Sequence, residues 1–429
     1  MLGAFLVEEK SIFVHLHYDN YCVRLIDFTV SNGAHLQHDP IYHGYLPVST
    51  ATYTTRQCGA NLTNLWLDVV AVVDNSQGMT NDGLTSIAAN IASVFSAGTR
   101  IGTTPSEPRT TRLGLVTYNS QATKNADLNQ FQSLDDLYAS IFGDLDSVSD
   151  VDESYLETGL AAAEEILEAG RAEFNRGYYK QVVLIYASTY NGDGEHTPIP
   201  VANRLKSSGV KIITVAYDQG GDGELMDDLA KISSPRFNFS NTDNQGVIGQ
   251  IQGALLEANC FCPNTWIQYR ESYSDSTSSP GGVCIQPVGL NAVWKAAKLA
   301  CSNRWKNSHL ADEFTQEKHD FILEAVKDTP GFFPPYSYHI GLTLSNGDWT
   351  WDRPSGWAQP KVENWFGWNP GYPISSSSMA SGMNIQKGGE GTGWQNIGMY
   401  NTGANYICET ATCDTDNFCE SGGDDEVFI

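Results

Sequence analysis

Residues 65–79, LWLDVVAVVDNSQGM, constrain the fold of this chain more than any other stretch. An apolar, largely β-branched run ends abruptly at Asp74 and Ser76, and glycine and asparagine follow before a helical pattern begins. Such a run predicts a strand buried on both faces, as in a parallel sheet covered by helices. Asp74 and Ser76 would then lie at the carboxyl end of a central strand, where open α/β sheets bind ligands. Their oxygens suit a hard cation such as Mg²⁺.

The pattern around this stretch predicts more of the same layer structure. Strand-like runs occupy residues 65–73, 113–118, 182–186 and 212–217. Helical spacing of apolar residues occurs at 84–95, 156–169 and 225–232. Strands that alternate with helices predict an α/β domain with a doubly wound, mainly parallel sheet, and we place it at residues 58–260.

Asp74, Ser76 and Gly78 resemble the first segment of the metal-ion-dependent adhesion site of von Willebrand factor A domains, whose pattern is Asp-x-Ser-x-Ser. Gly78 departs from that pattern. In that family a Thr on a second loop and an Asp after a later strand complete the site. Ser154 falls where the Thr is expected, whereas Ala187 falls in the Asp-Gly position and cannot bind a metal. The resemblance therefore implies a weakly held divalent cation, Mg²⁺ or Ca²⁺, bound by Asp74, Ser76 and Ser154.

The same loop admits two other interpretations. Asp74 or Ser76 could be an ordinary helix N-cap whose side chain accepts from backbone amides. A hydrolase would need Ser76 to act with His196 and Asp218. A nucleophile elbow requires a glycine two residues before the serine, where this chain has Asp74, and the order Ser, Asp, His is not met. We therefore predict no enzymatic activity.

Composition and cysteine content indicate an extracellular protein. The 50 acidic residues outnumber the 25 Lys and Arg residues, so the formal charge is −25 and nucleic acid is disfavoured as a partner. Nine cysteines without a paired zinc pattern predict disulfides in an oxidising compartment. Asn61-Leu-Thr and Asn238-Phe-Ser are candidate glycosylation sites.

The two ends of the chain differ from its middle. Residues 1–57 show no clear helical or strand period, and we interpret them as a leader or poorly ordered segment. Their apolar start is short and lacks a basic flank, so no signal peptide is evident and we expect the true start upstream. No apolar stretch is long enough for a transmembrane helix. Residues 411–429 read as an acidic, solvated tail.

After residue 260 the alternation stops, and Trp, Ser, Gly and Pro become frequent. Apolar residues recur at helical spacing over 290–303 and would share one face of a helix: Leu290, Val293, Trp294, Ala297 and Cys301. A second helix follows with Thr315 as its cap. Core strands are predicted at 338–342, 347–351 and 405–409.

The helix that ends at Cys301, the Ile340-Gly341-Leu342 strand and the closing Ile407-Cys408-Glu409 are similar to an α+β C-type lectin-like domain in its long form. The resemblance covers residues 261–410. An A domain followed by such a domain resembles secreted proteins that are expanded in nematodes. The resemblance implies recognition of glycans or proteins and a role in innate defence.

The cysteines pair as follows. The resemblance implies bonds from Cys262 to Cys284 and from Cys301 to Cys408. Cys58 and Cys260 flank the first domain where its ends should meet, so we predict that they bond as well. We predict that Cys413 and Cys419 close a small loop, which leaves Cys22 as the odd cysteine, without an assigned partner.

In the sugar-binding members of that family, calcium is held by an acid or amide on each side of a proline and by Asn-Asp after a Trp. Here Tyr372 and Ile374 flank Pro373, and the later triplet is Trp394-Gln395-Asn396. Because amides alone seldom hold calcium well, the resemblance implies no calcium-dependent sugar site.

The aromatic residues of the same loop remain as candidates for ligand contact. Trp368 and Tyr372 are our predicted ligand-binding residues, because an aromatic face stacks on a sugar ring or a protein side chain without metal. Trp394 is predicted to be in the core. The leading interpretation is a secreted recognition protein that binds carbohydrate or protein ligands. The alternative is an adhesion or extracellular-matrix protein that acts only through protein contacts.

Overall fold

The structure is a computed structural model of the chain. It describes residues 3–7, 10–14, 17–19, 22–24, 55–96, 98–104, 106–173, 176–192, 194–217, 223–243, 246–386 and 391–420. The chain divides into two compact units, Met1–Thr52 and Tyr53–Ile429.

Two short antiparallel hairpins make up the described part of the first unit. β1 (Gly3–Val7) pairs with β2 (Lys10–Val14), and β3 (His17–Asp19) pairs with β4 (Cys22–Arg24). The sequence analysis found no strand period here. Strands of three to five residues are too short to display a convincing alternation.

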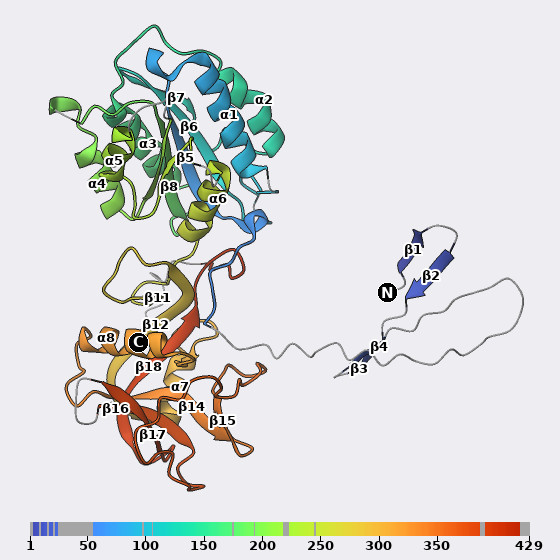
Figure 1. Cartoon of the computed structure of the whole chain (residues 1–429), viewed down its shortest axis with the longest axis vertical. Coiled ribbons are helices and arrows are strands. Elements are labelled where there is room, and N and C mark those ends of the chain that lie inside the picture. Colours follow the sequence, from blue (N-terminus) through green and yellow to red (C-terminus); the bar gives the residue numbers. More distant parts are fainter. Residues whose placement is uncertain are drawn as a thin grey trace, which may run out of the picture. The chain divides into compact units, whose positions relative to one another are not determined.

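The first domain of the second unit is a six-stranded sheet with helices on both faces (Figure 1). The strand order is β10-β9-β8-β5-β6-β7, and every pairing is parallel except that of β7. In chain order the elements are β5 (Leu67–Asp74), α1 (Asn81–Phe95), β6 (Arg112–Tyr118), β7 (Ala122–Ala126), α2 (Leu134–Asp144), α3 (Leu156–Arg171), β8 (Lys180–Ala187), α4 (Ile199–Ser207), β9 (Lys211–Ala216), α5 (Glu224–Ala230), β10 (Asn238–Ser240) and α6 (Val247–Ala258).

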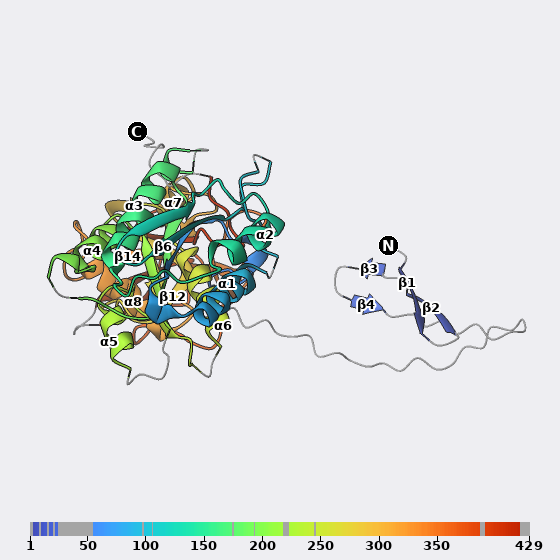
Figure 2. The same ribbon diagram turned by 90° about the horizontal axis from the view of Figure 1, so that it is seen from above.

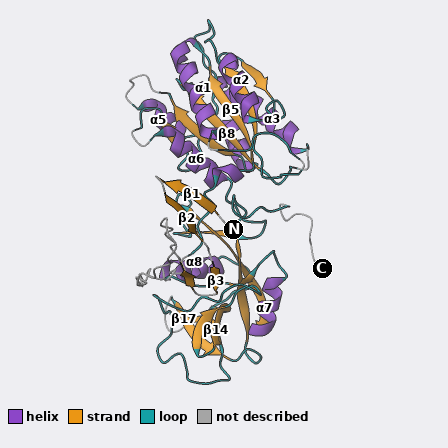
Figure 3. Cartoon of the chain, turned by 90° about the vertical axis from the view of Figure 1, so that its right-hand side faces the viewer, coloured by secondary structure: helices purple, strands orange, loops and turns teal. Residues whose placement is uncertain are grey.

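The alternation of side chains along β5 explains the layering. Val69, Ala71 and Val73 pack against α1, α2 and α6 on one face, and α1 lies beside α6 (Figure 2). Val70 and Val72 pack against α3, α4 and α5 on the other face. Both faces are therefore buried, and helices enclose the strands (Figure 3). The predicted doubly wound, mainly parallel fold is confirmed.

All four predicted strands and all three predicted helices of this domain are present, with ends shifted by a few residues. The structure adds α2, α4, α6, β7 and β10. β7 carries the polar sequence ATKNA, and most of its residues are only half-buried or exposed. A sequence pattern that relies on apolar runs does not detect such an edge strand.

A buried acid joins two arginines at the amino end of β5. Asp68 is 0% exposed and accepts from Arg112 at 2.9 and 2.6 Å and from Arg176 at 3.1 Å. Arg112 also donates to the Gly170 carbonyl, and Arg176 to the Thr110 carbonyl, both at 2.8 Å. These bonds tie the ends of two strands and a helix together, because each buried charge needs its partners.

The second domain is built on a mixed sheet with two helices. Its strand order is β11-β12-β18-β14-β16-β17, with β13 paired to β18 and β15 to β14. The elements are β11 (Ile267–Arg270), β12 (Pro280–Val293), α7 (Trp294–Ser302), β13 (His309–Leu310), α8 (Gln316–Lys327), β14 (Ser337–Ser345), β15 (Asp348–Trp351), β16 (Ser381–Gln386), β17 (Thr392–Ile397) and β18 (Gly403–Ala411).

The predicted helices of this domain are present, but the start of the first one differs. α7 begins at Trp294, whereas Leu290 lies in β12 and is 62% exposed. Pairing of Ala292 and Val293 with β18 keeps this stretch in a strand. A long-range pairing thus overrides the local helical period. Thr315 caps α8 as predicted and accepts from the Lys318 amide.

The structure forms all four predicted disulfides. They are Cys58–Cys260, Cys262–Cys284, Cys301–Cys408 and Cys413–Cys419. Only Cys22 stands outside this set.

The prediction of a solvated tail is wrong for residues 412–415 and for Cys419, which are buried. Asp414 is 0% exposed and accepts from Arg56 at 2.6 and 2.9 Å. Its backbone carbonyl accepts from Trp66 Nε1 at 3.1 Å, and the Trp66 ring packs on Phe261 and Phe418. The acidic composition misled the prediction because it does not reveal that one carboxylate has a cationic partner far away in the chain.

We expect Asp68→Asn to destabilise the first domain by about 3–5 kcal/mol, because it leaves two arginines buried without their counter-charge. The free energy of unfolding of the full chain, measured in urea, tests this expectation.

A matched control is Glu165→Gln. Glu165 pairs with Lys124 at the surface, where the two side chains are 67% and 45% exposed. Loss of an exposed pair should change the free energy of unfolding by no more than about 1 kcal/mol. Equal losses in the two variants would contradict a special role for Asp68.

Candidate functional site

The loops at the carboxyl ends of β5 and β8 and the loop before α3 meet around Asp74, which is 0% exposed. Its Oδ1 accepts from the Ser76 amide at 2.9 Å. Its Oδ2 accepts from Ser154 Oγ at 3.1 Å. The structure thus brings together the three predicted metal-binding residues, although they are separated by up to 80 positions in the chain.

Ser188 is a further member of this cluster that the sequence analysis missed. Its Oγ and its amide both donate to Asp74 Oδ2, at 2.6 and 3.2 Å. Ala187, which the sequence analysis placed at this position, is buried in β8 and belongs to the core on the α3 face. The residue after β8 that faces Asp74 is Ser188 and not Ala187. The third loop therefore contributes a hydroxyl group to the cluster.

The oxygen atoms of this cluster suit a divalent cation, but together they carry little negative charge. Ser76 Oγ is buried and has no hydrogen-bond partner among the described residues. A Cβ built on Gly78 would lie 3.9 Å from Ser76 Oγ and 3.6 Å from Ser188 Oγ, so the missing family serine would point into the same space. Asp74, Ser76, Ser154 and Ser188 are the residues that would hold the ion. One carboxylate with three hydroxyls makes a weak site, since ligand charge sets affinity for hard cations.

The residues of the hydrolase alternative are arranged differently. His196 stacks face to face on Tyr155, with 3.9 Å between ring centroids and 8° between planes. Asp218 lies outside the described residues. The backbone amide of Ser76 donates to the Asp74 carboxylate, as in the capped first turn of a helix.

In the second domain, the long loop rests on a set of tryptophans. Trp394 is 0% exposed, and its Nε1 donates to Glu313 at 2.6 Å, so it belongs to the core as predicted. Trp368 is half-buried and packs edge-on against Trp349 and Trp394, with centroid distances of 5.0 and 5.6 Å. Part of the Trp368 ring therefore serves packing, which leaves less of it for a ligand than the sequence analysis assumed.

Asn396 holds the long loop through three hydrogen bonds. Its Oδ1 accepts from the Ile374 amide at 2.7 Å, and its Nδ2 donates to the carbonyls of Ile374 and Met379 at 2.8 and 3.1 Å. This amide stands where the sugar-binding relatives have a calcium-binding carboxylate. It is 1% exposed and engaged with backbone, so its role here is to position the loop.

Exposed apolar side chains mark the accessible surface of this region. Trp357 is 53% exposed, Phe366 60% and Ile374 45%, whereas Tyr372 is half-buried. The sequence analysis did not single out Trp357 or Phe366, because tertiary packing decides which aromatic residues are buried in the core and which stay exposed.

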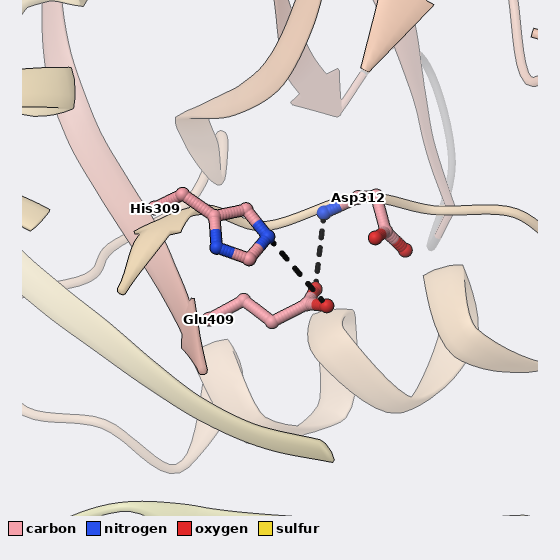
Figure 4. Close-up of side chains that lie close together, drawn as sticks. All are labelled: His309, Asp312 and Glu409. Carbon is pink, nitrogen blue, oxygen red and sulfur yellow. Dashed lines mark hydrogen bonds and ion pairs between the residues drawn. The ribbon is translucent and has the colours of Figure 1, made fainter. Parts of the chain in front are cut away.

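A buried cluster of charges was also missed (Figure 4). Glu409 of β18 faces His309 and accepts from the Asp312 amide at 3.1 Å. Lys318 of α8 lies between the two carboxylates, 2.5 Å from Asp312 and 2.8 Å from Glu409, and is 0% exposed. Arg353 pairs with Asp312 as well.

Two cations thus balance two carboxylates in this cluster, and His309 stays neutral. Burial, followed by the charge of Arg353, lowers the pKa of His309 to about 4. Burial and the nearby Asp312 raise the pKa of Glu409 to about 7. A metal ion would have to displace Lys318 and Arg353, so the arrangement indicates a structural ion network.

The two candidate glycosylation sites differ in geometry. Asn61 is exposed and its side chain accepts from Thr63. Asn238 Nδ2 donates to the Met226 carbonyl at 2.8 Å, and its Oδ1 accepts from Thr214 at 2.7 Å. A glycan is attached to Nδ2, the atom that at Asn238 is bonded to the Met226 carbonyl, so Asn61 is the better candidate.

With the geometry established, comparison with known proteins assigns the class. Residues 68–254 match the family model of the von Willebrand factor type A domain, and residues 291–410 match that of the C-type lectin domain. The protein therefore joins a von Willebrand factor A domain to a C-type lectin domain. Domains of these two kinds serve binding and recognition, and neither match indicates a catalytic family.

Among curated proteins, the chain is similar to C-type lectin domain-containing protein 160 of Caenorhabditis elegans, at 25% identity over 375 residues. The match covers 85% of this chain and 56% of that protein, so the chain spans just over half of its relative's length. Among the described residues, none of the helices combines the length and the hydropathy that a bilayer span requires.

Two solved proteins are each similar to part of this chain. Proximal thread matrix protein 1 from the mussel byssus is 20% identical over 46% of this chain and 47% of its own, with a TM-score of 0.36, and a further structure of it has a zinc-occupied MIDAS motif. The snake venom toxin convulxin is 16% identical over 35% of this chain and 97% of its own, with a TM-score of 0.23.

We expect the full chain to bind Mg²⁺ or Mn²⁺ with a dissociation constant of about 10⁻³ M or weaker, as for sites with few charged ligands. The double variant Gly78→Ser/Ser188→Asp should tighten binding by about tenfold or more, because it adds a hydroxyl and a carboxylate next to Asp74. Titration calorimetry measures both. Micromolar binding by the parent that disappears in Asp74→Asn would contradict the weak site.

His309 should make stability depend on pH. Because its pKa is lower in the folded than in the unfolded protein, stability is lost as pH falls from 6.5 towards 4, by about 3 kcal/mol in total. Glu409 acts in the opposite direction, since its raised pKa makes stability fall as pH rises from about 4.5 to 7. His309→Gln removes only the first effect. Urea unfolding at pH 7 and pH 4 should therefore show a smaller acid loss in the variant, and parallel losses would refute this.

Proposed function

We propose that this protein is a secreted recognition protein whose C-type lectin domain binds a glycan or protein ligand without calcium. The observation that carries the proposal is the engagement of Asn396 with the backbone of the long loop. An amide with three hydrogen bonds to its own chain has neither the charge nor the free oxygen that calcium requires. We therefore assign ligand contact to the partly exposed aromatic side chains of the long loop.

Several features support secretion and recognition. Four disulfides are typical of proteins that mature in an oxidising compartment. The formal charge of −25 opposes binding to phosphate backbones. Innate defence is the setting that the family resemblance implies. The first domain would add protein contacts, with a weakly held divalent cation at Asp74.

The partly exposed faces of Trp368 and Tyr372 are the proposed contact surface. Trp368 is braced by Trp349 and Trp394, so its position is fixed before a ligand arrives. A rigid aromatic side chain loses little conformational freedom on binding. Tyr372 adds a ring with a polar tip, which suits contact with a sugar ring or a protein side chain.

Retention of the full chain on a glycan array, with and without EDTA, tests the proposal. We expect retention to persist in chelator and to fall about tenfold in Tyr372→Ala, the usual scale for an aromatic contact residue. Tyr400→Ala is the matched control, because Tyr400 is 72% exposed and outside the long loop.

Release by chelator alone would overturn the calcium-free mechanism. An array without any retained glycan, together with capture of an extracellular protein that Tyr372→Ala abolishes, would favour the adhesion or matrix alternative.

A further inference from the structure

A cleft of about 430 Å³ opens on the C-type lectin domain. Its walls come from α7, from the residues around β13, and from the segment 352–359 that follows β15. The six residues that matter here are Lys298, Ser308, His309, Asp352, Arg353 and Trp357. The described residues that line it do not include Trp368, Tyr372 or Asn396.

The floor of the cleft is held rigid by the buried charge cluster. Arg353 is 12% exposed and donates to His309 Nε2 and to Asp312. His309 also contacts the Asn307 carbonyl through Nδ1 at 3.0 Å. The polar groups that face the cleft are thus fixed before any ligand enters, which lowers the conformational cost of binding.

Ser308 supplies an unmet hydrogen bond. It is 2% exposed, and its Oγ has no hydrogen-bond partner among the described residues. A buried hydroxyl without a partner is unfavourable, so a native structure that retains one calls for an explanation. A ligand hydroxyl in the cleft would supply the hydrogen bond that Ser308 Oγ lacks. This would explain a serine at this position.

The walls offer balanced charge. Lys298 pairs with Asp352, whose side chain is 3% exposed against 32% for Lys298. Arg353 is balanced by the carboxylates of the buried cluster. A charged ligand would therefore gain no net attraction, whereas a polyol could accept from Lys298 and donate to Asp352 at once.

The rim adds an apolar face. Trp357 lines the cleft and is 53% exposed. The C–H face of a sugar ring stacks on indole, while its hydroxyls reach polar groups beside it. The volume lies within the range of small-molecule sites and admits one or two sugar rings.

We propose that this cleft is a metal-independent subsite for a neutral mono- or disaccharide, stacked on Trp357 and hydrogen-bonded by Lys298, Asp352 and Ser308. The inference deepens the proposed function and rests on the form of it in which the C-type lectin domain binds a glycan. It assigns ring recognition to a second place on that domain.

The experiment is a glycan array that carries neutral and acidic saccharides, probed with the full chain in EDTA. Trp357→Ala should reduce retention on neutral saccharides by about tenfold, and Ser308→Ala by several-fold. Phe333→Ala is the matched control, since Phe333 is 76% exposed, lies outside the long loop and does not line the cleft, and it should leave retention unchanged. Trp357→Tyr should restore most of the retention, which a loss of folding would not allow.

The outcomes separate the two proposals. Retention that falls in Tyr372→Ala but not in Trp357→Ala overturns the cleft and leaves the proposed function standing. Retention of acidic saccharides only, lost in Trp357→Ala, overturns the neutral ligand. An array that retains nothing overturns the cleft and the glycan-binding form of the proposed function together.

Discussion

The C-type lectin domain depends on one buried ammonium group. Lys318 projects from α8 into a site with no solvent access and meets Asp312 and Glu409, which come from the segment after β13 and from β18. A buried charge without partners is far too unfavourable to persist, so these three parts of the chain have to assemble together. Arg353 then joins from the segment after β15 and forms the floor of the cleft with His309. The same network that stabilises the domain therefore also forms the floor of the proposed ligand site.

The von Willebrand factor A domain divides its charges between the two ends of β5. Asp68 at the amino end is saturated by two arginines and serves stability. Asp74 at the carboxyl end is surrounded by serine hydroxyls and has no cationic partner among the described ion pairs. The strand is otherwise apolar and wholly buried, so it separates the ion network at its amino end from the candidate metal site at its carboxyl end. Ligands bind at the carboxyl ends of such sheets because the loops there converge.

Local patterns carried most of the fold prediction. The apolar run before Asp74, the helical spacing in α1 and α3 and the cap at Thr315 all depend on neighbours within a few residues, and all are present. Polar β7 was missed, and the helical interpretation of Leu290 was wrong, because pairing with distant strands decides both. Ser188 was missed for a related reason: only the register of β8 against β5 shows which residue faces Asp74.

The sequence by itself determined the layer fold of the first domain and the place where the second domain begins, and its resemblance to two families added the domain identities and two of the four disulfide pairs. Tertiary structure alone decided which polar groups are paired. Asp414 meets Arg56 across 358 positions, Glu409 meets Lys318 across 91, and Asn396 closes on the loop at Ile374. The physical reason is that apolar burial and chain period are encoded locally, whereas the partner of a buried charge or amide depends on where the fold brings distant segments together.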